Sequence, residues 1–500
     1  MLPSPCLTGL PIEVRLQIYQ LYFHCPGGLL YSHDSQKLHA KDPDEKFEVS
    51  LIFTCRTIAA ETQGLPFEFN TITFTTGCHI KNYSHAGEYS RILHALSTQR
   101  FKVLCYMRPA ISEEIYEEVT SRFPRFTPVL DAIRQHPPLE GGDNWNWISE
   151  ISRWGDVPFH TREATVLTCQ LALLLMEKEA VAAVARFLQG HPDLPPHNDP
   201  LRILTIDHKP WDIPSESELR RLEAALHDQS RGDSAWAQGV KKVHGAWRSS
   251  SQHPRPYHFS AATTAIQFLR QMSVEQRMHL RNIVLREDSK SVAYPACHAR
   301  GLIPFCQQNP HLHIERRVSL FGNILEVPDG LFPAETRSRS DLSKALAVWL
   351  AEAMDLGPAG MPPNAFSFVL DDDQAPDRAR ITFDRVFQRS LTTQLHFEAL
   401  YERSGQETRD FFQMTKNELY ILDGFPRAIE ELFRNNGILR CSFSPGELGE
   451  DGRVPQSTLP PGDDFVNIVE DVGFNMRSVR FSFSDCIGEI FGHTEFPGLL

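Results

Sequence analysis

The segment LRNIVLREDSKSVAYPACHARGLIPFCQQNPHLHIERRVSL, residues 280–320, indicates the fold of the larger part of the chain. It begins with LRNIVLRED, an apolar run that ends in charged residues, and it closes with LHIERRVSL. Both stretches are typical of β-strands. We expect the intervening HARGLIPFCQQNP to form a helix that ends at Asn-Pro. A strand, a helix and a strand in this order predict an α/β architecture.

The same order continues on both sides of this segment. We expect further helices in SESELRRLEAAL, TTAIQFLRQM, KALAVWLAEAM and FPRAIEELFRNNG, and further strands in LRILTID, AFSFVLDDD and MRSVRFSFSD. The alternation has no fixed period, so two arrangements stay open: an irregular solenoid-like stack and an open parallel sheet. This strand–helix region spans residues 196–500. It includes a Pro/Gly-rich loop near 447–464 that we expect to be mobile.

Two other parts precede this region, as a length of 500 residues leads one to expect. Residues 1–80 predict a small helical module that closes with a short strand, NTITFTT. Its charged stretch SHDSQKLHAKDPDEK, Ser32–Lys46, is expected to be a solvated loop. Residues 81–195 predict a helical connector that ends at the Pro-rich break QGHPDLPPHNDP. The fold class is therefore mixed α/β.

Composition excludes several classes of function. The formal net charge of −13 argues against non-specific nucleic-acid binding, which needs basic surface. The longest apolar run, Val166–Met176, is too short to span a bilayer, so no membrane role is expected. Ten cysteines without framework spacing, after a start that lacks a secretory signal, favour a reducing cytoplasmic or nuclear location.

No stretch predicts a metal, a cofactor or a catalytic residue. Cysteines and histidines gather in residues 297–313, but their spacing matches no common zinc site; they are Cys297, His298, Cys306, His311 and His313. Asp371–Asp373 and Glu287-Asp288 follow predicted strands, where α/β enzymes hold ligands. Because no phosphate-binding glycine loop accompanies them, we interpret both as solvated loops.

A hydrolase triad is also not predicted, because no Gly-x-Ser-x-Gly elbow accompanies the candidates His244, His258, Ser260 and Asp207. We therefore expect a protein that is not an enzyme. An enzyme of unknown reaction in the α/β region is the less favoured alternative, and a ligand pocket lined by Asp371–Asp373 or by Glu287 and Asp288 would support it.

The opening stretch LTGLPIEVRLQIYQLYF, Leu7–Phe23, predicts a helix with apolar residues on two sides. Pro11 suits the first helical turn, and Glu13 complements the helix N-terminus. One narrow polar stripe separates two apolar rows; the first row is Val14, Ile18 and Leu21, and the second is Ile12, Leu16, Tyr19 and Phe23. One row must meet the protein's own second helix. The other meets either the following domain or another chain, because exposed large apolar side chains are costly.

LTGLPIEVRLQIYQLYF followed by LIFTCRTIAAET resembles the F-box, a helical module that docks on Skp1-type adaptors of cullin–RING ubiquitin ligases. The likeness lies in the Leu10-Pro11 entry, the Ile18/Leu21 helix and the Leu51…Cys55-Arg56 helix. A polar insertion and the Asn70–Phe74 strand are similar to an F-box-like variant of filamentous fungi. The stretch FLRQMSVEQRMHLRNIVLREDSKSVAYPACHARGLIPFCQQNPHLHIERRVSLFGNIL resembles blocks found downstream in large fungal proteins of this kind.

The resemblance implies a protein-interaction module: a substrate receptor that holds a Skp1-type adaptor at one end and an unknown target protein at the other. It places the adaptor contact on Leu10, Pro11, Val14, Ile18, Leu21, Leu51, Cys55 and Ile58. The alternative is a non-catalytic scaffold whose F-box-like cap packs inward. In that case residues beyond about position 80 would cover Val14, Ile18 and Leu21.

Overall fold

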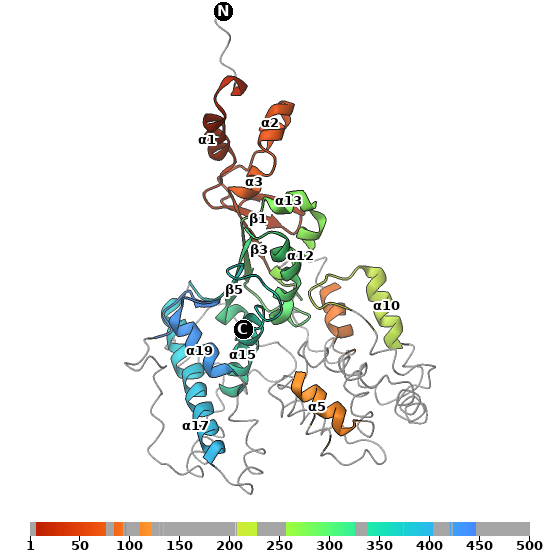
Figure 1. Cartoon of the computed structure of the whole chain (residues 1–500), viewed down its shortest axis with the longest axis vertical. Coiled ribbons are helices and arrows are strands. Elements are labelled where there is room, and N and C mark those ends of the chain that lie inside the picture. The colour runs from red at the N-terminus through yellow and green to blue at the C-terminus, as the bar shows by residue number, and fades with distance from the viewer. Residues whose placement is uncertain are drawn as a thin grey trace, which may run out of the picture.

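The computed structural model describes residues 7–76, 85–93, 96, 111–122, 130, 134, 206, 208–227, 257–325, 339–373, 375–403, 421 and 424–446. A seven-stranded sheet with helices forms the centre of this part, so the mixed α/β class is confirmed (Figure 1). The strands are β1 (Leu29–Ser32), β2 (Lys37–Ala40), β3 (Thr71–Thr75), β4 (Asn282–Glu287), β5 (His313–Ser319), β6 (Phe366–Asp371) and β7 (Leu439–Cys441).

Helices pack beside the sheet and build the projecting N-terminal end. Near the N-terminus they are η1 (Leu7–Gly9), α1 (Ile12–Phe23), η2 (Ser50–Phe53), α2 (Arg56–Glu61), α3 (Leu65–Glu68) and α5 (Glu113–Arg122). Farther along the chain are α10 (Glu216–His227), α12 (Ala261–Gln271), α13 (Val274–Met278), η6 (Pro295–Leu302), α14 (Ile303–Gln308), η7 (Leu320–Ile324), α15 (Arg339–Met354), α16 (Pro376–Thr382), η8 (Phe383–Gln388), α17 (Arg389–Arg403) and α19 (Phe425–Arg434).

The strand order advances in one direction along the sheet. It is β2-β1-β3-β4-β5-β6-β7, with an antiparallel β1–β2 hairpin and parallel pairing everywhere else. Parallel crossovers are right-handed, so an order that never reverses brings the connecting helices to the same face. Within the described residues the chain thus forms an open, mostly parallel sheet, which is one of the two arrangements that the sequence left open; a solenoid-like stack has the same unreversed strand order.

Strand register separates a core face from a polar face. Ile72, Ile283, Ile314 and Phe366 lie in one row across the sheet, and all four belong to the hydrophobic core with α12, α15 and α19. The alternate rows carry polar residues; one of them is Thr75, Arg286 and Arg317.

Local sequence explains these helices well. In α19 the buried residues Phe425, Ala428, Ile429, Leu432 and Phe433 follow the spacing of a single helical face. The helix α12 begins at Ser260, whose side chain accepts a hydrogen bond from the backbone of Thr263. A reciprocal Ser273–Gln276 capping box starts α13.

The predicted solvated loop at Ser32–Lys46 is wrong in part, because it contains β2. The backbone turns at Gln36, which has a φ of 54°, and brings Lys37–Ala40 back against β1. Ala40 is buried and Leu38 packs against the core, so KLHA contributes apolar contacts despite its charged surroundings. Since β1 and β3 pair into the same sheet as β4, strands from both sides of position 80 share one sheet.

Several predicted elements lie outside the described residues. They include most of the 81–195 connector, most of LRILTID, all of MRSVRFSFSD and the loop at 447–464. Within the connector, residues 85–93 and Glu113–Arg122 are helical as expected. None of the helices in the described part of the chain has the length and apolarity needed to cross a membrane.

Candidate partner-docking surface

The N-terminal module projects from one end of the sheet. Figure 1 shows α1 and α2 standing away from the α/β body, with α3 at their base. Tyr19, Phe23, Ile58 and Leu65 form a small core between these helices. The module therefore has its own apolar core, to which α1 contributes residues from only one of its sides.

An ion pair fastens α1 to α2 beside this core. Arg15 donates through Nη2 to Glu61 Oε1 at 2.6 Å and through Nε to Oε2 at 2.9 Å. The Tyr19 hydroxyl donates to the same carboxylate at 2.8 Å. Hydrogen bonds from Arg15 and then from Tyr19 hold the pKa of Glu61 below its ordinary value. These contacts fix which side of α1 faces inward.

Asn70 locks the end of α1 to the rest of the module. Its Nδ2 donates to the carbonyls of Phe23 and Pro66, at 2.7 and 2.8 Å, and its Oδ1 accepts from the Cys25 backbone. Because Asn70 is buried and directly precedes β3, it ties the helix end to the sheet. The α1 helix is thus held at both its middle and its C-terminus.

The outer apolar row of α1 is open to solvent. At about 100° per residue, Val14, Ile18 and Leu21 project from the side opposite Tyr19 and Phe23. Leu21 is 83 % exposed and Val14 is 40 % exposed, while Ile18 is half-buried. We call Val14, Ile18 and Leu21 the docking row. The inward-packed alternative required residues of the α/β region to cover it, and Val14 and Leu21 are not covered.

The remaining predicted contact residues divide by their accessibility. Leu10, Pro11 and Cys55 are exposed, and Leu51 is half-buried. Ile58 is only 5 % exposed and packs with Tyr19 inside the module core. Ile58 therefore supports the module from within and cannot contact a partner in this conformation.

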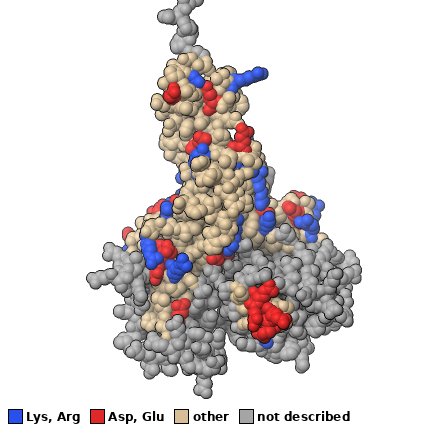
Figure 2. Space-filling view, viewed as in Figure 1, with Lys and Arg blue, Asp and Glu red and all other residues tan. Residues whose placement is uncertain are grey.

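Sequence reasoning missed the most exposed aromatic residue of the module. Phe53 is 81 % exposed at the end of η2. The run Leu51–Phe53 is continuously apolar, so the sequence alone does not tell which of its side chains turns outward. In Figure 2 the projecting end is largely uncharged, with isolated acidic and basic groups. Apolar groups grouped in this way mark interaction sites on protein surfaces.

The position of Glu287 after a strand suggests a solvated loop, but this interpretation is wrong. It lies wholly buried at the end of β4 and accepts from Arg316 at 2.7 Å and from the backbone of Ala261 and Ala262. Arg316 also lies over the Trp349 ring, 4.6 Å from its centroid. This pair joins two strands to the start of α12, so its contacts are those of a structural ion pair.

Ser260, one of the triad candidates in the sequence, forms a hydrogen bond with His298. The Nε2 of His298 lies 2.6 Å from the Ala293 carbonyl and so carries the proton, while Nδ1 accepts from Ser260 at 2.7 Å. Burial, and then the charge of Arg316, lower the pKa of His298 to about 3. Both His298 and Ser260 are at most 1 % exposed, so a substrate could not reach them in this conformation.

Asp371–Asp373 are likewise tied into the fold and are not a freely solvated loop. Arg317 binds both oxygens of Asp371, at 2.9 and 3.0 Å, and also reaches Asp373. Burial raises the pKa of Asp372 to about 6, and that side chain accepts from the Phe321 backbone. Of the residues placed by the structure, no three Asp, Glu, His or Cys side chains are arranged to hold a metal ion.

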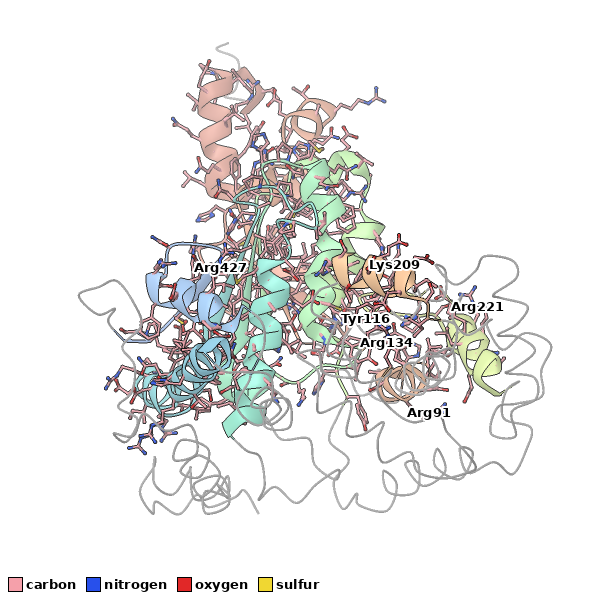
Figure 3. The ribbon with its side chains drawn as sticks, turned by 60° about the horizontal axis from the view of Figure 1, so that its bottom comes forward. Arg91, Tyr116, Arg134, Lys209, Arg221 and Arg427 are labelled. Atoms are coloured by element: carbon pink, nitrogen blue, oxygen red, sulfur yellow. The ribbon has the colours of Figure 1, made fainter. Side chains whose placement is uncertain are left out.

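Two arginines form ion pairs with acidic residues of α10 and α5. Figure 3 shows Arg91 and Arg134; Arg91 binds Glu223 at 2.7 Å, and Arg134 binds Glu113 at 2.5 Å. These pairs reduce the positive charge available to phosphates.

Comparison with protein-family models, with curated proteins and with solved structures gives no match for this chain. The candidate site therefore rests on its own geometry: a braced helix that buries Tyr19 and Phe23 inside the module. Of the row predicted to face inward, Ile12 and Leu16 are each 41 % exposed, so that row is buried only in its C-terminal half.

Proposed function

We propose that this protein is an F-box-like substrate receptor, in which the docking row binds a Skp1-type adaptor of a cullin ubiquitin ligase. The observation that carries the proposal is the exposure of Val14 and Leu21 on a helix that the buried Tyr19 and Phe23 of its opposite side anchor to the module. The Arg15–Glu61 pair supports it, because a fixed helix loses little conformational entropy on binding.

In this role the protein forms and breaks no bonds itself. The module holds the adaptor, and the α/β region presents a target protein, so that the effective concentration of the target at the ligase rises. Adaptors of this kind place the protein in the cytoplasm or the nucleus. The target and its contact residues are separate from the docking row.

The test is binding of the full chain to a purified Skp1-type adaptor. Leu21→Asp should weaken binding by at least 2 kcal/mol, about 30-fold, if Leu21 is a central contact. Because Leu21 is 83 % exposed, the Leu21→Asp substitution should change the free energy of unfolding by less than about 0.5 kcal/mol. Val274→Asp is the matched control, since Val274 on α13 is also exposed, at 53 %, but lies outside the module.

Two results would overturn the proposal. One is a folded wild-type chain that does not bind the adaptor; the other is a Leu21→Asp variant that binds as well as the wild type. The first would leave the scaffold as the better explanation, and the second would move the contact away from α1.

A further inference from the structure

The face of the sheet opposite the core carries polar side chains that reach solvent. Helices α12, α15 and α19 pack on the core face. On the opposite face Asn282 and Arg440 are exposed, and Val284, Arg286 and Glu315 are half-buried. Parallel sheets are usually covered on both faces, so a parallel sheet with solvent-accessible polar side chains on one face offers a surface for a partner.

One row on this face holds three arginines in register, and we call it the arginine row. Arg286 on β4 lies beside Arg317 on β5, Val369 on β6 follows, and Arg440 on β7 ends the row. Val369 is only 5 % exposed and places an apolar side chain between the last two cations. Like charges on neighbouring strands repel each other, so anions close to the row stabilise it.

The fold itself neutralises the central arginine of the row. Arg317 binds both oxygens of Asp371 and also pairs with Glu315 and Asp373. The hydrogen bonds to Asp371 raise the pKa of Arg317 above its ordinary value. Because three carboxylates surround this cation, it attracts a further anion only weakly.

The two outer arginines lack such partners. Arg286 reaches only Asp288, at 3.4 and 3.5 Å, which is long for a charged hydrogen bond. Arg440 donates to the Gly437 carbonyl at 3.3 Å, and no acidic side chain among the described residues forms an ion pair with it. Anionic groups of a partner can therefore pair with the two ends of the row.

The separation of these ends specifies the shape of the partner. Neighbouring strands lie about 4.8 Å apart, so the three steps from β4 to β7 place Arg286 and Arg440 roughly 14 Å from each other. An extended peptide advances about 3.4 Å per residue, and every second side chain points to the same side. Acidic residues four positions apart in such a peptide therefore match the two ends of the arginine row.

A continuous polyanion matches this surface less well. Nucleic acids carry a phosphate at every nucleotide, and the carboxylates of Asp288, Glu315 and Asp373 lie at the row between its cations. The formal net charge of −13 opposes such a partner as well. Two separate acids in a peptide avoid the carboxylates that already neutralise the centre of the row.

We infer that the arginine row binds an extended peptide segment of a partner protein, with acidic residues four positions apart on Arg286 and Arg440. The inference rests on the proposed function in one respect. In that function the α/β region holds the target protein, so the bound segment belongs to the target.

The experiment is a titration of the full chain at low salt with a fluorescent seven-residue peptide, followed by anisotropy. The peptide has glutamate at its second and sixth positions, valine at its fourth and threonine elsewhere; in the control peptide both glutamates are glutamine. The acidic peptide should bind about tenfold more tightly than the control peptide, because two surface charge pairs form.

Variants of the two outer arginines test where the peptide binds. Arg286→Met and Arg440→Gln should each weaken binding of the acidic peptide about threefold, and the double variant should bind both peptides equally. Arg56→Gln is the matched control, because it removes the same charge from α2, which stands away from the α/β body (Figure 1). This control should bind like the wild type, and equal melting temperatures show that the variants are folded.

The outcomes separate this inference from the proposed function. Equal affinity of the wild type for both peptides, or a double variant that still prefers the acidic peptide, would overturn the inference and leave the adaptor proposal intact. A single-stranded oligonucleotide that binds more tightly and displaces the peptide would assign the row to nucleic acid and overturn it too. If the peptide binds as expected but the adaptor does not, the peptide site stands and the proposed function is wrong.

Discussion

Glu61 on α2 accepts hydrogen bonds from two nitrogens of Arg15 on α1, at 2.6 and 2.9 Å, and so determines which row of α1 faces solvent. Glu61→Gln should leave a weaker, uncharged contact and lower the melting temperature. It should also weaken adaptor binding less than Leu21→Asp does, because the docking row itself is intact. Thermal unfolding and the adaptor titration measure the two effects. Equal melting temperatures for variant and wild type would contradict this role.

The same pair predicts a dependence on acid. The pKa of Glu61 is lowered in the folded protein from its ordinary 4.5. Its contribution to stability is therefore fully present above that value and is lost as the pH falls through the lower, folded pKa. Glu61→Gln should show less loss of stability than the wild type over this acid range. Parallel curves for the two proteins would contradict the assignment.

Breaking the buried Glu287–Arg316 ion pair should strongly lower the free energy of unfolding. Glu287→Gln leaves a buried guanidinium without its charge partner, which should cost about 3–5 kcal/mol of unfolding free energy. Glu287→Gln combined with Arg316→Met should recover part of this loss, because no buried charge remains. Arg286→Met is the control, since Arg286 lies one residue away with only a 3.4 Å contact to Asp288. Urea unfolding distinguishes the three variants, and a loss below about 1 kcal/mol for Glu287→Gln would contradict the account.

Replacement of Asp372 should increase the stability of the protein at neutral pH. Burial raises the pKa of Asp372 from 3.8 to about 6, so the folded state binds a proton more tightly than the unfolded state. Stability from this group is present below pH 3.8 and is lost as the pH rises to about 6. Asp372→Asn should therefore stabilise the protein at pH 7 by about 1 kcal/mol, while its amide oxygen still accepts from Phe321. Unfolding at pH 4 and pH 7 measures this, and equal effects at both values would be contrary to it.

Gly64 shows how the module is held on the body. Its φ is +79°, and a Cβ there would lie 2.0 Å from the ring of His279, which itself bonds Glu68 of α3. Gly64→Ala should cost more than about 1 kcal/mol of unfolding free energy, because both the backbone and the packing resist it. Gly357→Ala is the control, since no atom lies within 4 Å of a Cβ there. A neutral Gly64→Ala would show that this contact is not constrained.

Local patterns in the sequence predicted much of this fold. The α19 pattern from Phe425 to Phe433 specifies its buried side without tertiary information, and the strands at β4 and β5 were predicted at the correct places. The antiparallel β2 was missed, because KLHA is too short and too charged to show a strand pattern. Its pairing depends on the turn at Gln36.

The sequence could not predict the candidate sites fully, because many of their contacts join residues that are far apart in the chain. Arg316 lies in a row with Leu285 and Phe368 on the core face, and only the strand register shows that Glu287 is there to neutralise it. For the module, the two apolar rows of α1 could be separated by helical geometry alone. The burial of Ile58 and the exposure of Phe53 depend instead on how η2 and α2 fold back onto α1.

The most direct measurement is hydrogen–deuterium exchange of the full chain with and without a purified Skp1-type adaptor. The account predicts slower exchange on binding in peptides covering Ile12–Phe23 and Ser50–Arg56, with little change in Val274–Met278 or Phe425–Arg434. Unchanged exchange in both module peptides, or protection confined to the α/β region, would contradict the claim that the docking row of α1 is where this protein meets its adaptor.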